Sequence, residues 1–246
     1  MKFISVFFLL NISLFAVSFD EAAMQFHQKN YTTAFKSFEA LALKGDPNAQ
    51  YNVALMLTKG YDNIAKNHKQ SFKWYKKAAL LGHKESQNNL ATIYFNGDHV
   101  TKDLNKALQW YKKSAQQGYV LAKFNLAIIY ERNINVKNIP QAMKLFKQSA
   151  DLGYVHANVH LADIYREGRS AHQDYNKSFI YYFAALEQNS AKAMYFVGLF
   201  YFYGYGVIGD KNKAKFWMKE AQKLKYKRAG IFLFNHRDEF NRAITL

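Results

Sequence analysis

The sequence predicts an all-α fold made of stacked helix–turn–helix repeats. Three observations support this prediction: a pattern of small and apolar residues that recurs every 35 to 37 residues, a low content of helix-breaking residues (2 Pro and 12 Gly), and capping residues between the apolar segments. Half of the 246 residues are hydrophobic, so the chain can form a core and is not disordered. Self-similarity at such a period is typical of helical repeat arrays.

Residues 1–18 have the pattern of a secretory signal peptide. Lys2 precedes an apolar run, and Ala16 and Ser18 place small residues at the positions that a signal peptidase reads, so we expect cleavage before Phe19. The alternative is an uncleaved membrane anchor, for which the run is short, because a bilayer span needs about 20 residues. Export predicts a periplasmic or secreted protein. Because the chain has no cysteine, its stability must come from packing.

The repeats divide the rest of the chain. Residues 19–45 predict a helix pair, with helices around 21–28 and 31–43. Five repeats are then expected over 46–226, at 46–82, 83–118, 119–153, 154–189 and 190–226. Residues 227–246 start one more helix and become charged from His236 to Glu239, which suits a C-terminal cap with a polar outer face.

The first helix of each repeat, helix A, is marked by a small residue, an aliphatic residue four positions later, a second small residue and an aromatic or aliphatic residue. In the fourth repeat these are Ala157, Leu161, Ala162 and Tyr165. This spacing places all four on one face of a helix. One helix pair cannot bury such faces alone, so we expect neighbouring repeats to stack.

The second helix, helix B, has its own stripe and recognisable ends. The stripe contains Trp74, Trp110, Leu145, Tyr181 and Trp217, each followed by another large apolar residue. Asp or Asn precedes each helix B as an expected N-cap, at Asn67, Asp103, Asn138, Asp174 and Asp210. Glycines that are expected to form left-handed C-terminal caps follow four of the A helices, at Gly60, Gly97, Gly168 and Gly204.

This pattern resembles the Sel-one-like repeat (SLR) family, which is similar to tetratricopeptide repeats. The fifth repeat carries the fullest match, from Ala193 through Gly204 and Asp210 to Trp217. The third departs most, with Asn133 at the loop glycine position and Pro140 near the start of helix B, where proline is tolerated. The resemblance implies a right-handed α/α solenoid with a concave face and a scaffold or adaptor role. The chain also resembles the exported cysteine-rich SLR proteins of Helicobacter, but it lacks their cysteines.

Catalytic chemistry has little support in the sequence. Some cysteine-rich SLR relatives are described as penicillin-binding or β-lactamase proteins, and this is the rival hypothesis. It requires an activated nucleophile such as Ser-x-x-Lys, but no serine has a lysine three residues later. No cofactor-binding motif is present. His156 and His160, with Asp163, share a helical face, but two exposed histidines are favoured over a metal site, which needs more ligands.

A protein or peptide partner is the expected ligand. The resemblance places helix A on the concave face, where the tentative partner-binding residues are Asn52, Asn89, Phe124, Asn125, His156, His160, Tyr195 and Phe196. An asparagine amide can both donate to and accept from a peptide backbone. The alternative is that these asparagines form hydrogen bonds between neighbouring helices. The net charge of +16 favours acidic partners, including acidic envelope polymers, while export argues against nucleic acid.

Overall fold

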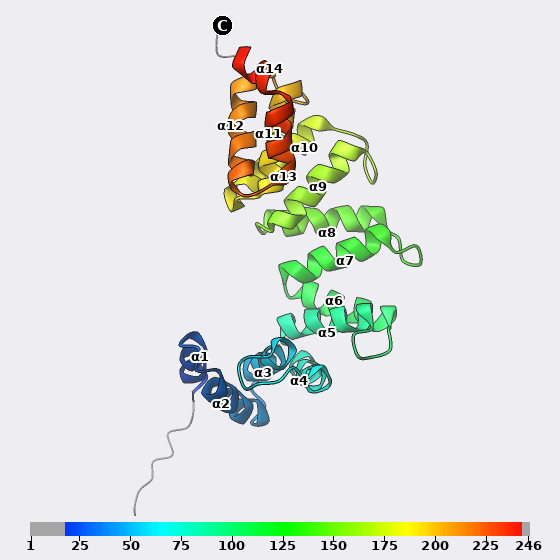
Figure 1. Ribbon diagram of the computed structural model, residues 1–246. Coiled ribbons are helices and arrows are strands. Elements are labelled where there is room, and N and C mark those ends of the chain that lie inside the picture. The colour runs from blue at the N-terminus through cyan, green and yellow to red at the C-terminus, as the bar shows by residue number, and fades with distance from the viewer. Residues whose placement is uncertain (1–17, 243–246) are drawn as a thin grey trace, which may run out of the picture. The chain divides into compact units, whose positions relative to one another are not determined.

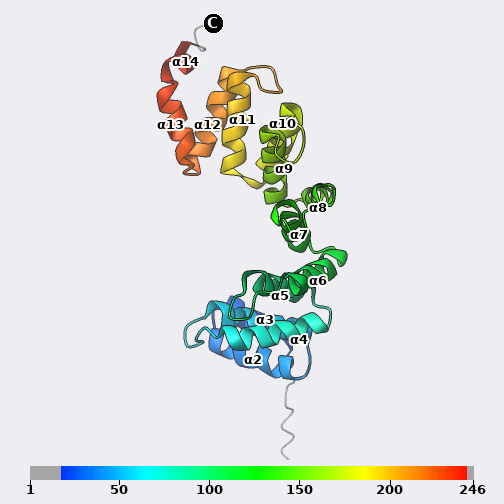
Figure 2. The same ribbon diagram turned by 90° about the vertical axis from the view of Figure 1, so that its right-hand side faces the viewer.

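The computed structural model describes residues 18–242, which form fourteen α-helices, one 3₁₀-helix and no strand (Figures 1 and 2). The predicted signal peptide lies almost wholly outside these residues. Within them, no helix is long and apolar enough to cross a membrane. The chain divides into two compact units, residues 1–107 and 108–246, each described separately below. The all-α repeat fold that the sequence predicts is confirmed.

The first unit consists of consecutive helices that pack on one another. Its helices are α1 (Phe19–His27), α2 (Tyr31–Leu43), α3 (Pro47–Lys59), α4 (His68–Leu80), α5 (Lys84–Asn96) and the start of α6 (Leu104–Gln116). Ala22, Phe38, Val53 and Met56 belong to the core that joins the first three helices. The predicted N-terminal helix pair therefore packs directly against the first repeat.

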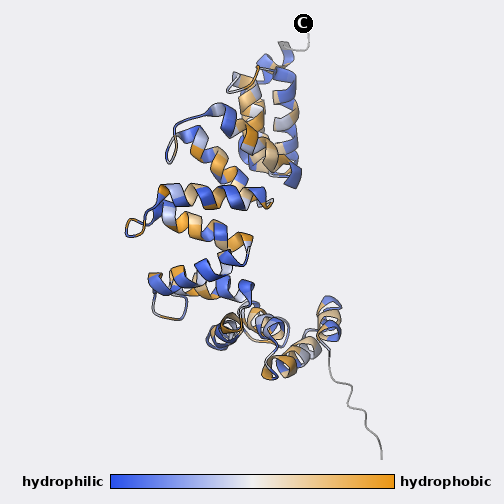
Figure 3. Ribbon diagram, turned by 180° about the vertical axis from the view of Figure 1, so that it is seen from behind, coloured by the Kyte–Doolittle hydropathy of each residue, from blue (hydrophilic) through white to orange (hydrophobic). Residues whose placement is uncertain are grey.

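The second unit continues the alternation of A and B helices. After the rest of α6 come α7 (Val120–Arg132), α8 (Ile139–Asp151), α9 (Val155–Glu167), α10 (Tyr175–Ala184), η1 (Ala185–Gln188), α11 (Ala191–Tyr203), α12 (Lys211–Lys223), α13 (Lys227–Asn235) and α14 (Arg237–Arg242). Apolar residues recur along the helices of both units (Figure 3). In the second unit, buried residues of consecutive helices form the core, such as Phe200 of α11 with Tyr182 of α10, and Met218 of α12 with Phe232 of α13.

The small residues of helix A are buried, as the pattern predicts. The first small residue of every A helix is fully buried, at Ala49, Ser86, Ala122, Ala157, Ala193 and Ala229. At Gly198 a Cβ atom would lie 3.1 Å from the side chain of Met218 on α12. Small side chains therefore allow helix A and helix B of one repeat to approach closely.

In helix B, the most deeply buried register is one residue later than the tryptophan register. The five residues that follow it are at most 3% exposed: Tyr75, Tyr111, Phe146, Tyr182 and Met218. The tryptophans are only partly buried, and the amines of Lys77 and Lys113 lie 4.3 and 4.6 Å from the rings of Trp74 and Trp110. These rings therefore support lysine side chains at the surface.

The capping predictions hold with local differences. Side-chain oxygens of Asn67, Asn138, Asp174 and Asp210 accept the backbone N–H three residues later, and Asp103 does the same for Lys106. Gly97, Gly168 and Gly204 adopt the left-handed conformation, whereas Gly60 combines a positive φ of 71° with an extended ψ of 143°. Where the B-helix glycine is replaced, Asn189 and Lys225 adopt positive φ themselves.

The C-terminal end is less polar than its sequence suggests. Phe240 of α14 is buried against Phe202 and Phe232, so α14 folds back onto the last repeat. However, Ile231 and Phe234 of α13 are 60% and 76% exposed. The charged residues of α14 therefore do not cover the outer face of α13.

Candidate functional site

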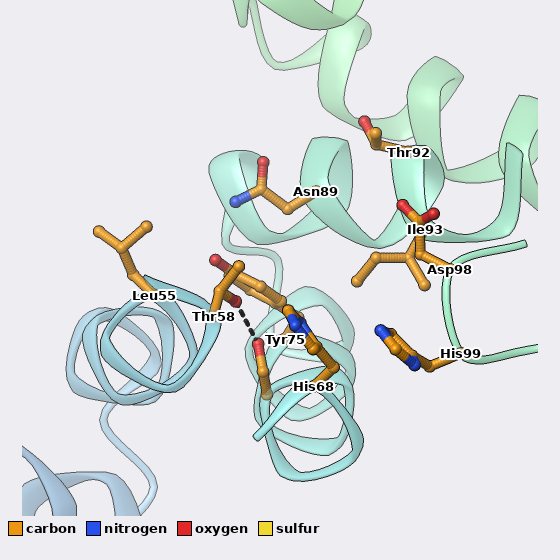
Figure 4. Close-up of a pocket in the computed structure, with 10 residues that line it drawn as sticks. Leu55, Thr58, His68, Tyr75, Asn89, Thr92, Ile93, Asp98 and His99 are labelled. Atoms are coloured by element: carbon orange, nitrogen blue, oxygen red, sulfur yellow. Dashed lines mark hydrogen bonds between the residues drawn. The ribbon is translucent and has the colours of Figure 1, made fainter. Parts of the chain in front are cut away.

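The first unit contains a pocket of about 350 Å³ between α3, α4, α5 and the loop after α5 (Figure 4). Its polar lining consists of Thr58, His68, Ser71, Tyr75, Asn89, Thr92, Asp98 and His99. Leu55 and Ile93 supply apolar surface. This volume lies at the lower end of the range for small-molecule sites and suits one or two side chains of a longer partner.

A hydrogen-bond network fixes the floor of this pocket. The hydroxyls of Thr58 and Ser71 lie 2.6 Å apart, and Ser71 donates to the carbonyl of Ala54 at 2.8 Å. Thr58 and the Asn89 amide hydrogen-bond the hydroxyl of Tyr75, whose pKa is raised mainly by burial. Tyr75 therefore stays neutral and holds α3, α4 and α5 in register.

Two histidines form one wall of the pocket. The rings of His68, the first residue of α4, and His99, in the loop after α5, are stacked with centroids 4.4 Å apart (Figure 4). His99 has a positive φ of 58°, which turns the loop toward α4. Beside it, Asp98 accepts a hydrogen bond from Asn96 at 3.0 Å. The wall is exposed and carries both donors and acceptors.

The second unit contains a buried carboxylate at Glu131 on α7. Its oxygens lie 2.8 Å from Nε2 of His160 on α9 and 3.0 Å from the hydroxyl of Ser170. Burial alone would raise the pKa of Glu131. Hydrogen bonds and charge from His160, together with Ser170 and Arg169, outweigh burial and lower the pKa to about 2. The carboxylate therefore joins α7 to the following A helix.

A second buried carboxylate, Asp163, joins α9, α10 and α11. It accepts hydrogen bonds from Tyr182 at 2.6 Å, Lys192 at 2.5 Å and Arg166 at 3.2 Å. Burial would raise the pKa of Asp163, but these partners lower it. The same burial and the nearby Asp163 charge raise the pKa of Tyr182. Both buried acids are thus fully paired, which indicates an architectural role rather than general acid–base catalysis.

The predicted asparagine ladder makes internal contacts. Asn89 lines the pocket and bonds Tyr75 on the preceding helix, as the alternative interpretation expects. Asn52 instead donates to the carbonyl of Asn48 in its own helix, at 2.9 Å. Asn125 is partly buried and also interacts within the protein. All three remain partly exposed.

The other predicted partner-binding residues belong to the second unit. Phe124 contacts Tyr154 and the buried Phe146, with ring centroids 5.1 and 5.6 Å away. His160 is buried against the same Phe146 ring, while His156 is exposed. Their side chains therefore differ in environment, although they lie four residues apart.

Phe196 and Tyr195 lie on α11. Phe196 is buried, stacked on Tyr182 at 4.8 Å, with the guanidinium of Arg166 4.6 Å from its ring centroid. Tyr195 is partly exposed and contacts Tyr226. Asn89, His160 and Phe196 therefore share one feature: each contacts the buried residue of the preceding helix B. Among residues 18–242, no three acidic or histidine side chains are arranged to hold a metal.

Sequence reasoning missed the pocket residues of helix B and of the loop after helix A. His68 follows the N-cap Asn67 directly, and His99 follows the loop glycine Gly97 by two residues. Both positions are fixed relative to residues that the pattern identified. The signal was therefore present, but only the fold shows that the two positions meet.

Comparisons with known proteins identify the repeat. The family described as Sel1 repeat matches residues 47–83, 84–119, 120–154, 155–190 and 191–224. The crystal structure of a Sel1 repeat protein from Oxalobacter formigenes is similar with a TM-score of 0.82 and 26% identity, over 89% of each chain. No curated protein matches the chain.

Two further solved structures are similar. A protective antigen from uropathogenic Escherichia coli with an SLR fold has a TM-score of 0.78 and 28% identity over 91% of this chain; the chain spans only 48% of that protein. The immunity protein Pa5087 from Pseudomonas aeruginosa shares the fold, with a TM-score of 0.55 and 16% identity over 82% of this chain and 81% of its own. Because the five matched segments cover well over half of the sequence, the chain belongs to the Sel1 repeat family.

Proposed function

We propose that this protein is an exported, non-enzymatic adaptor that binds a segment of a partner protein in the pocket of the first unit. Sel1 repeat proteins generally mediate protein–protein interactions. The observation that carries the proposal is the pocket itself, which combines a fixed hydrogen-bonded floor with an exposed wall of donors and acceptors. A rigid floor with an adaptable polar rim suits recognition of peptide side chains and backbone.

The histidine wall provides the sharpest test. His68→Ala with His99→Gly removes both rings, and glycine retains the positive φ at position 99. The mature protein and this variant are used to capture partners from the envelope and medium of the source cells, and the affinity of any stoichiometric partner is measured by calorimetry. We expect at least a tenfold loss of affinity, with an unchanged melting temperature. The matched control is His27→Ala, another exposed histidine of the first unit.

Two results would contradict the proposed pocket and the adaptor role, and export has a test of its own. If a partner bound the double variant as tightly as the wild type, the pocket would not be the partner-binding site. Turnover of a chromogenic β-lactam by the purified protein would show an enzyme instead. Export rests on the pattern of residues 1–18 and is tested by mass spectrometry of the protein recovered outside the cytoplasm, where a chain that begins at Phe19 is expected.

A further inference from the structure

The second unit has a pocket at the repeat position equivalent to that of the first-unit pocket, with different chemistry. In each case the first residue of a helix B stacks on a residue of the loop after the next helix A: His68 on His99, and Tyr175 on Tyr205. Gly97 and Gly204 begin these two loops. The repeat geometry therefore brings the same two elements together in both units, although His99 lies two residues after Gly97 and Tyr205 one residue after Gly204.

The wall of the second pocket is a stack of three tyrosines. The Tyr205 ring stacks on Tyr175, with centroids 4.9 Å apart and an interplanar angle of 14°, and on Tyr203, at 5.3 Å and 22°. Tyr203 and Tyr205 are 50% and 42% exposed. The stack depends on Gly206, which has a φ of +67° and whose Cβ atom, if present, would lie 2.6 Å from the carbonyl carbon of Tyr175. Only glycine allows the loop to approach α10 this closely.

The rest of this pocket is an apolar floor with a polar rim. Phe200 is 1% exposed and forms part of the floor, and the volume is about 310 Å³. Arg166 and Gln173 supply the rim, and Gln173 donates to the Arg166 carbonyl at 2.8 Å. The guanidinium of Arg166 uses Nε and Nη2 for internal bonds, while Nη1 bonds no other residue within 18–242. An N–H donor therefore remains available at the rim.

We infer that this tyrosine pocket, formed by Tyr175, Tyr203, Tyr205, Phe200, Arg166 and Gln173, binds a proline-containing extended segment of the partner. The inference rests on the proposed adaptor function and specifies the chemistry of a second anchoring site. Proline-rich segments in the polyproline II conformation dock in aromatic-lined grooves, because their shape is preformed and costs little entropy to fix.

Donor and acceptor chemistry supports the same occupant. An extended segment has carbonyls without internal hydrogen bonds, which suit the guanidinium and the tyrosine hydroxyls. Proline has no backbone N–H, so it needs no hydrogen-bond acceptor in the pocket. Exposed tyrosine rings such as Tyr203 and Tyr205 also stack with sugars, so carbohydrate is titrated as the alternative ligand.

The test is a calorimetric titration of the whole mature protein with a decaproline peptide. A Gly-Ser peptide of equal length and chitotetraose are titrated in parallel. We expect decaproline alone to bind, and Tyr203→Ala with Tyr205→Ala to weaken its binding at least tenfold. The matched control is Phe216→Ala, because Phe216 of α12 is 53% exposed but lies outside the pocket lining. Gly206→Ala should weaken binding as well, since it displaces the loop that carries Tyr205 without removing any lining side chain.

Each alternative result overturns the inference. Decaproline that does not bind, or that binds the tyrosine double variant as tightly as the wild type, excludes a proline-recognising pocket. Chitotetraose binding that is lost in the same variant assigns the pocket to carbohydrate. The proposed function has a separate readout, since capture of a partner that depends on His68 and His99 can succeed when decaproline fails. In that case only the tyrosine pocket loses its assigned ligand.

Discussion

At the residue scale, the buried acids of the second unit decide how its repeats are joined. Glu131 and Asp163 are each 7% exposed, and together they contact side chains from α9, α10, α11 and the loop after α9. A buried charge is tolerated only when it is paired and hydrogen-bonded. The stability of the interfaces between these repeats should therefore depend on pH and on the presence of both partners in each hydrogen-bonded pair.

The lowered pKa of Glu131 predicts acid sensitivity. A carboxyl whose pKa is lower in the folded protein stabilises it above the unfolded pKa of about 4.5, and this contribution is lost as the pH falls toward 2. From the difference between these values, we expect Glu131 to contribute up to about 3 kcal/mol at neutral pH. Urea unfolding of wild type and Glu131→Gln at pH 7, 5 and 3 should show a shallower pH dependence in the variant. Parallel curves would contradict this prediction.

Tyr182 provides a second residue-scale prediction. Tyr182→Phe removes the 2.6 Å hydrogen bond to Asp163 and a 3.2 Å bond from Arg166 at a fully buried position. We expect a loss of about 1–3 kcal/mol in the free energy of unfolding, because a buried carboxylate loses a donor. Tyr181→Phe is the control, since the Tyr181 hydroxyl is not hydrogen-bonded within residues 18–242. This variant should leave the free energy of unfolding almost unchanged. Equal losses in both variants would contradict the assigned role.

At the element scale, the stability of the protein comes from the apolar stripes of the A and B helices, which become buried when neighbouring helices stack. The same position of helix A carries Val53, Leu90, Leu126, Leu161 and Val197, all at most 4% exposed. Each contact lies between neighbouring helices, so a defect acts on its own repeat and the adjacent ones.

Leu126→Ala tests this packing. Leu126 is 4% exposed on α7, and truncation should cost roughly 2–5 kcal/mol through lost burial and a residual cavity. Leu152→Ala is the control, because Leu152 is 58% exposed and should change stability little. Chemical denaturation measures both. A cost near zero for Leu126→Ala would show that the A-helix stripe is placed wrongly.

The start of α1 carries another element-scale prediction. The Ser18 hydroxyl accepts the backbone N–H of Glu21 at 3.1 Å and caps the helix. The proposed cleavage before Phe19 would remove this cap, and loss of an N-cap typically costs about 1 kcal/mol of helix stability. Hydrogen exchange should therefore be faster in α1 of a chain that begins at Phe19 than in one that begins at Ser18, with α3 unchanged. Identical exchange in both chains would show that α1 depends on packing alone.

At the scale of the whole molecule, the net charge of +16 is unevenly distributed. Residues 211–228 contain seven lysines, one arginine and a single acid, Glu220. Lys215, Lys219 and Lys225 form no ion pair within residues 18–242. Such a surface attracts acidic polymers and acidic proteins over a distance that salt shortens.

Binding to poly-L-glutamate tests this charge. We expect measurable affinity in low salt that falls steeply as sodium chloride rises, because the Debye length shrinks from about 30 Å at 0.01 M to about 10 Å at 0.1 M. Replacing Lys215, Lys219 and Lys225 by Gln should weaken binding in low salt and reduce the dependence on salt. Affinity that does not change with salt would exclude an electrostatic mechanism.

The sequence by itself determined the helices, their caps and the repeat. These depend on local spacing: Asp or Asn at an N-cap, glycine after helix A, and small residues at one face, all of which act within a few residues or between adjacent helices. The repeat also predicted that Asn89, His160 and Phe196 hold equivalent positions.

Only the tertiary structure decided what those positions do. Asn89 bonds Tyr75, His160 pairs with Glu131, and Phe196 contacts Tyr182 and Arg166, because the preceding repeat supplies a different neighbour in each case. The two stacked walls, His68 on His99 and Tyr175 on Tyr205, join residues about thirty positions apart. Periodicity fixes which elements meet, but the chemistry of a contact depends on both side chains, and that pairing exists only after the repeats have stacked.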